Sequence, residues 1–223
     1  MESLPIFIKV KNARCLVIGG GEVATRKVAT LLKAEADVEV IAPKLCHELA
    51  DLHNDARIKH QKAAFNESHL AGATLVFAAT DDEAINVKIS NAAKALSIPV
   101  NVVDAPALCT FTMPSIVDRS PVLIAVSSNG SAPVLARMMR TKIETMVPTS
   151  YGRLANLARE FRETVKGKFS TMQSRRIFWE KVFQGPIAEL VFSGQETAAD
   201  RKSTRLNSQS HLNLVCRLLL EKK

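Results

Sequence analysis

The sequence predicts an α/β protein built around a doubly wound parallel sheet and followed by a smaller, mostly helical part. Apolar, strand-like segments alternate with helix-like segments through about residue 105. A glycine-rich stretch joins the first strand directly to the first helix. This alternation is typical of right-handed strand–helix–strand units, which place parallel strands side by side with helices on the faces of the sheet.

The first half of the chain supplies the expected sheet. Cys15–Ile18 and Thr74–Ala79 are short, continuous apolar runs, as in strands buried on both faces. Apolar residues recur with a helical period from Glu22 to Ala34, and Asp81 or Asp82 is suited to cap the helix that follows. The other expected elements are strands 37–42, 57–61 and 99–103, helices 46–53 and 83–96, a helical turn at 66–70, and Leu4–Val10 as either an edge strand or a lead-in.

The second half departs from the parallel pattern. Two apolar runs, Thr110–Val117 and Pro121–Ser127, predict a hairpin outside the sheet. A helix is expected over Val134–Met146, because Pro133 fits a first helical turn. The rest is helical and basic from 150 to about 183, with a turn signal at Lys166-Gly167, a break at Gly185-Pro186 and a short helix over 187–192.

The glycine-rich stretch has the layout of a dinucleotide-binding loop. The pattern G-x-G-x-x-A places Gly19, Gly21 and Ala24 at the three small positions between a strand and a helix. Such a loop lets a pyrophosphate come close to the main chain, and the N–H groups at the helix start favour the anion. An ordinary turn is the alternative for the glycines taken alone. In this context we expect a Rossmann-like site for a phosphate-bearing nucleotide.

The composition indicates a cytoplasmic protein that binds neither nucleic acid nor a membrane. The formal net charge is +8, but five of these charges fall in residues 201–223, so that no basic face is expected on the rest. No apolar run is long enough to span a bilayer, and no secretory signal is visible. The four cysteines lack the spacing of a disulfide framework or a metal site, and no protein metal site is expected. Residues 201–223 are expected to lie outside the fold, either as a native tail or as translated adapter sequence.

The carboxyl edge of the predicted sheet collects the candidate cofactor contacts. The acidic residue that often binds the ribose hydroxyls is missing, because Ala42, Pro43 and Lys44 end the second strand. The charge pattern therefore leaves NAD and NADP open, and Lys44 could accept a 2′-phosphate. We expect the backbone of Pro43 and Lys44 to flank the adenosine and the backbone at Thr80 to line the cofactor.

Two further groups are candidates for substrate chemistry. Asp104 ends the strand that begins near Asn101, so it should project at the same edge, either as a proton acceptor or as a turn former before Pro106. Ser127 and Ser128 belong to a hydroxyl-rich turn ahead of the helix that carries Arg137 and Arg140. Such groups suit carboxylate recognition, and a helix cap with a solvated basic face is the alternative.

Seven collinear motifs resemble the N-terminal module of siroheme synthase, the precorrin-2 dehydrogenase/sirohydrochlorin ferrochelatase family. The resemblance covers residue 1 to about 195 and is carried by LPIF (4–7), GGGEVATRK (19–27), ATDD (79–82), NVVDAP (101–106), MPSIVDRSP (113–121), AVSSNGSAPVLAR (125–137) and RRIFWEKVF (175–183).

The resemblance implies a homodimer with an NAD-binding Rossmann-like domain at 1–113, a dimerisation region at 114–148 and a helical domain at 149–200. It implies NAD-dependent oxidation of precorrin-2 to sirohydrochlorin, then insertion of Fe(II), a substrate, to form siroheme. A dehydrogenase alone and a non-catalytic NAD-sensing module remain the alternatives. NAD is expected over Gly19, Gly20, Gly21, Glu22 and Val23, Asp104 matches the family's catalytic aspartate, and the tetrapyrrole is expected at Asn101, Ser127, Ser128 and Arg137.

Overall fold

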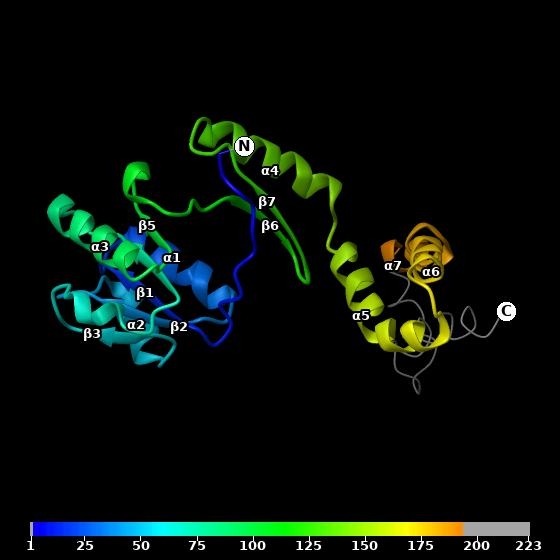
Figure 1. Ribbon diagram of the computed structural model, residues 1–223, viewed down its shortest axis with the longest axis horizontal. Coiled ribbons are helices and arrows are strands. Elements are labelled where there is room, and N and C mark those ends of the chain that lie inside the picture. The colour runs from blue at the N-terminus through cyan, green and yellow to red at the C-terminus, as the bar shows by residue number, and fades with distance from the viewer. Residues whose placement is uncertain (1, 194–223) are drawn as a thin grey trace. The chain divides into compact units, whose positions relative to one another are not determined.

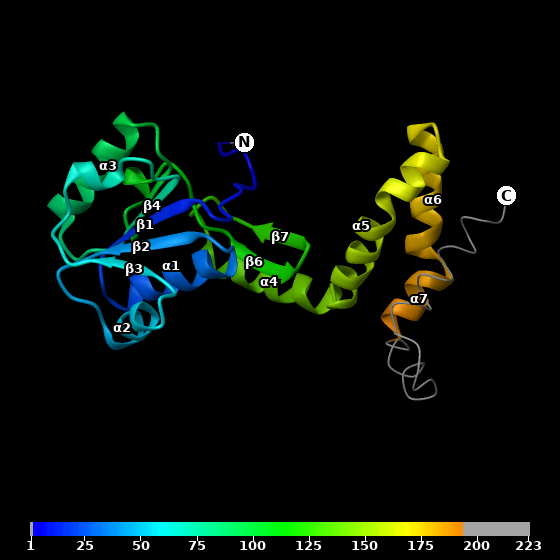
Figure 2. The ribbon, with the colours of Figure 1, turned by 90° about the horizontal axis from the view of Figure 1, so that it is seen from below.

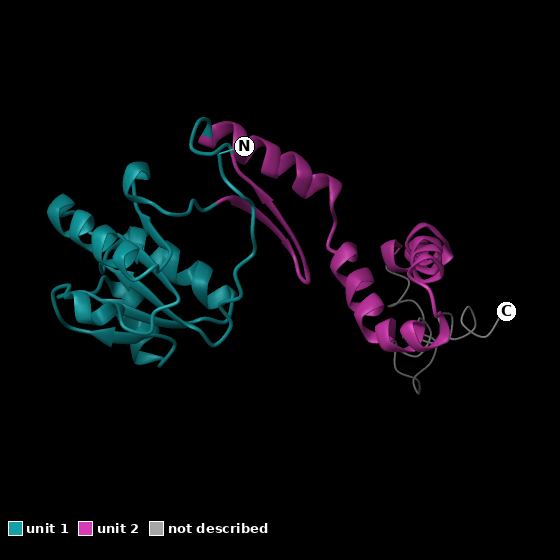
Figure 3. Cartoon of the chain, in the orientation of Figure 1, with its two compact units in different colours: residues 1–113, 128–132 teal, residues 114–127, 133–223 magenta. Residues whose placement is uncertain are grey.

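The computed structural model describes residues 2–193 (Figure 1). The chain divides into two compact units (Figure 3). Unit 1 holds residues 1–113 and 128–132, and unit 2 holds residues 114–127 and 133–223. The tail expected beyond residue 200 lies outside the described residues. No helix among the described residues is long and apolar enough to cross a membrane.

Unit 1 is built on a five-stranded parallel sheet in the order β3-β2-β1-β4-β5. The order reverses beside β1, the first strand of the chain, as in doubly wound folds. β1 and β4 are almost wholly buried, which explains why their sequences are continuous apolar runs. The strands are β1 (Arg14–Ile18), β2 (Asp37–Ile41), β3 (Lys59–Gln61), β4 (Leu75–Ala78) and β5 (Val100–Val102).

Helices cover both faces of this sheet, as Figure 2 shows from below. α1 (Glu22–Lys33) and α2 (His47–Asn54) pack on the face that carries Cys15 and Val17. α3 (Glu83–Ala95) and the 3-10 turn η1 (Glu67–Leu70) pack on the opposite face with Leu16 and Ile18. The alternation of side chains along β1 therefore separates two apolar cores. The expected Rossmann-like architecture is confirmed.

Because the thiol of Cys15 is buried, we expect the free energy of unfolding to fall at high pH. Its side chain is 0% exposed. Burial first, and the nearby Asp37 second, raise the pKa of the thiol to about 11 from 9.0. The folded state keeps the proton to higher pH than the unfolded chain, so this contribution is complete below pH 9 and is lost as the pH rises toward 11. Two pH units correspond to about 2–3 kcal/mol.

The prediction can be checked by urea unfolding of the natural chain and of Cys15→Ala at pH 8 and at pH 11. Cys15→Ala leaves a small cavity and is expected to cost about 1 kcal/mol at pH 8. Because alanine cannot ionise, the difference should shrink or reverse by pH 11. A difference that stays constant with pH would contradict the prediction and would place the thiolate in a solvated environment.

Unit 2 begins with an antiparallel hairpin, β6 (Ser115–Arg119) and β7 (Val122–Val126), and its described part continues with four helices. The first helix packs against the hairpin, and the last three enclose a separate apolar core around Leu157, Phe161 and Val182. The helices are α4 (Pro133–Met146), α5 (Ser150–Lys168), α6 (Met172–Gln184) and α7 (Pro186–Phe192).

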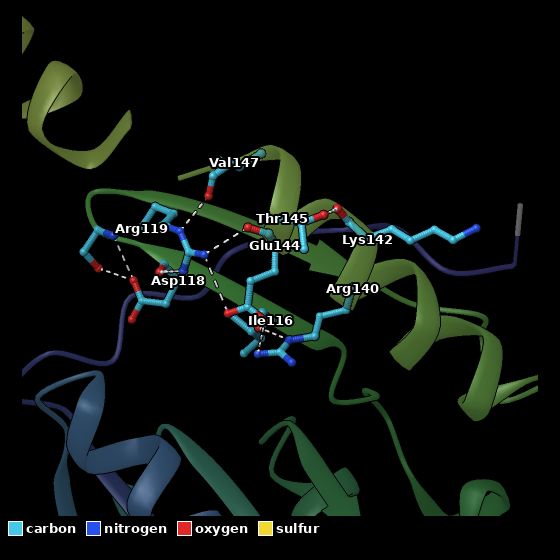
Figure 4. A network of polar contacts seen from close by, with 9 residues as sticks. Ile116, Asp118, Arg119, Arg140, Lys142, Glu144, Thr145 and Val147 are labelled. Carbon is cyan, nitrogen blue, oxygen red and sulfur yellow. Dashed lines mark hydrogen bonds and ion pairs between the residues drawn. The ribbon is translucent and has the colours of Figure 1, made fainter. Parts of the chain in front are cut away.

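Arg119 joins the hairpin to the C-terminal end of α4 (Figure 4). Its guanidinium donates to the carbonyl oxygens of Val147 at 2.7 Å and Glu144 at 3.2 Å. The Glu144 carboxylate lies 3.6 Å from Arg119 and 2.8 Å from Arg140, which also donates to the carbonyl of Ile116. These bonds satisfy carbonyls that a helix end leaves without partners, and they place positive charge at the negative end of the helix dipole.

Replacing Arg119 with methionine is expected to destabilise unit 2 by about 2–4 kcal/mol. The Arg119 side chain is 14% exposed, so its loss leaves the carbonyls of Val147 and Glu144 without these donors in a poorly solvated place. Arg140→Met is the matched control, because Arg140 is 35% exposed and should cost under about 1 kcal/mol. Thermal unfolding followed by circular dichroism measures the stability of both variants. Equal losses of stability would show that the burial of Arg119 does not account for its contribution.

The structure decides one open alternative and corrects one expected turn. Leu4–Val10 forms no strand, so the lead-in alternative holds. The turn expected at Lys166-Gly167 is wrong, because α5 continues through Lys168 and the break falls at residues 169–171. Gly167 has open space around it, and an exposed helix tolerates such a glycine. The other expected elements agree within a few residues.

Candidate functional site

The glycine loop between β1 and α1 is held against two neighbouring strand ends. The Gly19 N–H donates to the carbonyl of Ile41, and the Cys46 N–H donates to the carbonyl of Gly20 at 2.7 Å. Gly19 has φ +125°, and a Cβ there would overlap the carbonyl oxygen of Ala79. A Cβ on Gly20 would overlap the carbonyl oxygen of Lys44. Only glycine permits this packing at both positions.

The start of α1 is suited to a phosphate. Gly21 is the N-cap residue and supplies no side-chain hydrogen bond to the first turn. A Cβ at Gly21 would meet no protein atom within 4 Å, so the space in front of the helix is open. Helix N–H groups without partners and the positive end of the helix dipole together favour an anion. The residues present therefore fit a dinucleotide pyrophosphate.

A cavity of about 630 Å³ opens at this edge of the sheet. Its lining brings together all eight residues expected at the cofactor, which come from the glycine loop and from the segments after β2 and β4: Gly19, Gly20, Gly21, Glu22, Val23, Pro43, Lys44 and Thr80. Ile18, Ile41 and Phe65 add apolar surface. A volume of this size is typical of small-molecule sites.

The end of β2 carries no acidic side chain that faces the cavity. Glu39 lies earlier in the strand, and its carboxylate is 2.8 Å from a guanidinium nitrogen of Arg14. His60 of β3 contacts the carbonyl of Ala42 through Nε2 at 2.9 Å. Lys44 is exposed at the cavity lining. The charge pattern at the end of β2 therefore leaves both NAD and NADP open.

The segment after β4 is ordered by its own side chains. The Thr80 hydroxyl donates to Asn86 Oδ1 at 2.8 Å, and the Asn86 amide donates to the carbonyl of Thr80 at 2.9 Å. Asp82 accepts the N–H of Ile85 at 3.0 Å, which confirms Asp82 as the N-cap of α3. Asp81 lines the cavity. These bonds hold the Thr80 backbone at the site.

Asp104 lies at the turn after β5 and is exposed. Its φ of +57° is in the left-handed region, which aspartate tolerates better than most residues. Asp104 is not among the residues that line the cavity at the glycine loop, so the structure separates it from that group.

Cys109 and Asn101 brace the turn that carries Asp104. The Cys109 thiol accepts from the N–H of Val102 at 3.2 Å and lies 3.4 Å from the carbonyl oxygen of Ala105. The Asn101 amide donates to the carbonyl of Phe111 at 3.0 Å and is 9% exposed. The Asn101 amide is thus occupied inside the fold, and the contact with substrate that was expected of Asn101 stays a prediction.

The boundary between the two units falls inside the serine-rich turn, between Ser127 and Ser128. Ser128 belongs to unit 1, and its hydroxyl accepts the N–H of Ala132 at 3.0 Å, as a cap ahead of α4 does. Ser127 and Arg137 belong to unit 2, and both are exposed. Their expected contacts with substrate stay predictions.

The sequence gives no signal for the contacts of two further residues of unit 1. Lys27, in the second turn of α1, lies with its ammonium 5.5 Å from the centre of the Phe77 ring. Cys109 was noted only as one of four scattered cysteines. A lysine after an arginine in a surface helix gives no signal of this kind, because the packing of Lys27 on Phe77 joins segments far apart in the sequence.

Comparisons with protein families agree with this geometry. A family described as putative NAD(P)-binding matches residues 6–115, which include the whole glycine loop and Asp104. The family described as the sirohaem biosynthesis protein central region matches residues 119–146, and the one described as the sirohaem synthase dimerisation region matches residues 150–206. The region expected to dimerise was 114–148. The central family matches within that region, whereas the family of the dimerisation region matches residues 150–206. The chain is a Rossmann-like protein with an NAD(P)-binding domain.

Comparisons with individual proteins identify the relatives of the chain more specifically. The chain is 61% identical to the siroheme synthase of Methylobacillus flagellatus and 56% identical to that of Nitrosospira multiformis, in each case over 89% of this chain and 43% of the relative. The chain therefore belongs with the N-terminal part of the siroheme synthase family and spans less than half the length of these curated relatives. A solved structure titled "SirC, precorrin-2 dehydrogenase" shares the fold, with a TM-score of 0.63 at 20% identity over 81% of this chain and 89% of that chain.

Proposed function

We propose that the chain oxidises precorrin-2 to sirohydrochlorin with NAD as hydride acceptor, and that the same chain inserts Fe(II), as substrate, to form siroheme. The observation that carries the proposal is the unobstructed start of α1 at a 630 Å³ cavity, on the same sheet edge as the exposed Asp104. The similarity to siroheme synthases selects the tetrapyrrole pathway among the many reactions that such a site could serve.

The glycine loop and the start of α1 would hold the cofactor. The N–H groups at the helix start would bind the pyrophosphate, for which Gly21 leaves room, and the backbone at Pro43 and Lys44 would flank the adenosine. When bound, NAD supplies the acceptor for the hydride that the reduced macrocycle loses. The apolar side chains of Ile18 and Ile41 limit water at this part of the cavity.

Asp104 is the proposed base. Oxidation of precorrin-2 removes a hydride and a proton, and the exposed carboxylate takes up that proton. Insertion of Fe(II) displaces two pyrrole protons, which the same carboxylate can accept and pass to water. The macrocycle provides the nitrogen ligands of the iron. Exposed Arg137 and the serine turn are proposed to bind the carboxylates of the substrate, and two copies of the chain are proposed to associate through the family's dimerisation region.

Anaerobic incubation with precorrin-2 and NAD, with and without Fe(II), tests both steps. We expect NADH absorbance to rise with the appearance of sirohydrochlorin, and Fe(II) to convert that product into siroheme. No NADH would contradict the dehydrogenase proposal. Sirohydrochlorin that persists with Fe(II) at the rate of a protein-free control would contradict the chelatase proposal and leave a dehydrogenase alone.

A further inference from the structure

One side of the cavity combines an apolar lining with a single cation. Among the lining residues that come from β2, from β3 and from the segments after them, only Lys44 is charged. The others on this side are Ile41, Ala42, Pro43, Ala63, Ala64 and Phe65. The two carboxylates of the lining, Glu22 and Asp81, come from the start of α1 and from the segment after β4. Because β2 and β4 lie on opposite sides of β1, Asp81 belongs to the other half of the cavity.

The main chain of Lys44 is fixed against the glycine loop. Its carbonyl oxygen lies where a Cβ on Gly20 would overlap it, and the Cys46 N–H donates to the carbonyl of Gly20 at 2.7 Å. The Lys44 side chain is exposed, and within residues 2–193 its ammonium takes part in no ion pair. The charge therefore starts from a defined point beside the loop and remains available to an anion in the cavity.

The two carboxylates of β2 are engaged by other side chains. The Glu39 carboxylate lies 2.8 Å from a guanidinium nitrogen of Arg14, and the Asp37 carboxylate lies 2.8 Å from the ammonium of Lys59. Neither carboxylate lines the cavity. In dinucleotide-binding sheets, an acidic side chain near the end of this strand binds the ribose hydroxyls of NAD, and a basic side chain there accommodates a 2′-phosphate. A lysine without a competing carboxylate therefore attracts an additional phosphate instead of repelling it.

We propose that the cavity binds NADP as well as NAD, and that the Lys44 ammonium pairs with the 2′-phosphate of NADP. The position of the dinucleotide, with its pyrophosphate at the start of α1, rests on the proposed function. With either nucleotide the macrocycle loses the same hydride to the nicotinamide and the same proton to Asp104, so that only the reduced product differs, NADH or NADPH. The Lys44 side chain acts in binding and takes no part in the chemical step.

Calorimetric titration of the full chain with NAD and with NADP, without substrate, tests the proposal. We expect the Kd of NADP to lie within about tenfold of the Kd of NAD in the natural chain. The ratio of the NADP Kd to the NAD Kd should rise about tenfold in Lys44→Gln and about 100-fold in Lys44→Glu, and Lys44→Arg should restore it. The ratio is the readout, because a general effect of a substitution on the fold or on the adenosine changes both Kd values alike. Higher salt should weaken NADP binding more than NAD binding.

Lys62→Gln is the matched control. Lys62 follows β3, is exposed and does not line the cavity, so that its replacement removes the same charge from a neighbouring segment and should leave the ratio unchanged. A ratio in Lys44→Gln equal to the natural one overturns the proposal, and so does a natural chain that prefers NAD by more than about tenfold. If neither nucleotide binds, the proposed function is overturned together with it. If both bind as expected but precorrin-2 yields neither NADH nor NADPH, only the proposed function is overturned, and the assignment of Lys44 stands.

Discussion

Replacing Gly19 with alanine is expected to abolish measurable NAD binding and to lower the free energy of unfolding of unit 1 by at least about 2 kcal/mol. Gly19 has φ +125°, which an alanine adopts only with strain, and the new Cβ would overlap the carbonyl oxygen of Ala79 at the end of β4. The backbone must shift to relieve that overlap. Such a shift separates the glycine loop from β4 and moves the start of α1.

The variant Gly21→Ala separates the effect of the loop on NAD binding from its effect on stability. Gly21 has φ −94°, and its Cβ would meet no protein atom within 4 Å, so the thermal unfolding midpoint should stay near that of the natural chain. The added methyl group occupies the open space in front of α1, and NAD affinity should fall at least about tenfold. Calorimetric titration with NAD and circular dichroism melts measure both variants. Natural affinity in Gly21→Ala would mean that the pyrophosphate does not lie at this helix start.

The sheet and the glycine loop could be predicted because their signals are local. β4 is a continuous apolar run because both of its faces are buried, and Asp82 follows it at the position where a helix needs a cap. The glycines at 19 and 20 are required by contacts with Ala79 and Lys44, but the G-x-G-x-x-A pattern between a predicted strand and a predicted helix was enough to indicate the loop. Residues whose role depends on their immediate neighbours in the chain are readable in this way.

Contacts between segments far apart in the sequence could not be predicted. Nothing local in the sequence indicates that the Asn101 amide donates to the carbonyl of Phe111. Arg119 looked like part of a hairpin turn, yet its partners are carbonyls 25 and 28 residues away. Lys27 gave no signal, since its aromatic neighbour Phe77 belongs to β4.

Asp104→Asn is expected to lower NADH formation from precorrin-2 by about 100- to 10,000-fold, the range in which a general base contributes. Asparagine keeps the size of the side chain and tolerates the φ of +57° at this position, so the turn after β5 should persist. Alanine would be a poor substitute, because it would add backbone strain to the loss of the carboxylate. NAD affinity should be unchanged, since Asp104 does not line the cavity at the glycine loop.

Asp82→Asn provides the matched control for this result. It makes the same chemical change on the segment after β4, and asparagine is as good an N-cap as aspartate, so α3 and the rate should both be preserved. If Asp104→Asn kept the natural rate while binding NAD normally, the proton would have to leave through another group or directly to water. If both variants lost activity equally, the negative charge of the whole sheet edge would be required, rather than a base at one position. Only a loss confined to Asp104 identifies the exposed turn after β5 as the place where the substrate gives up its proton.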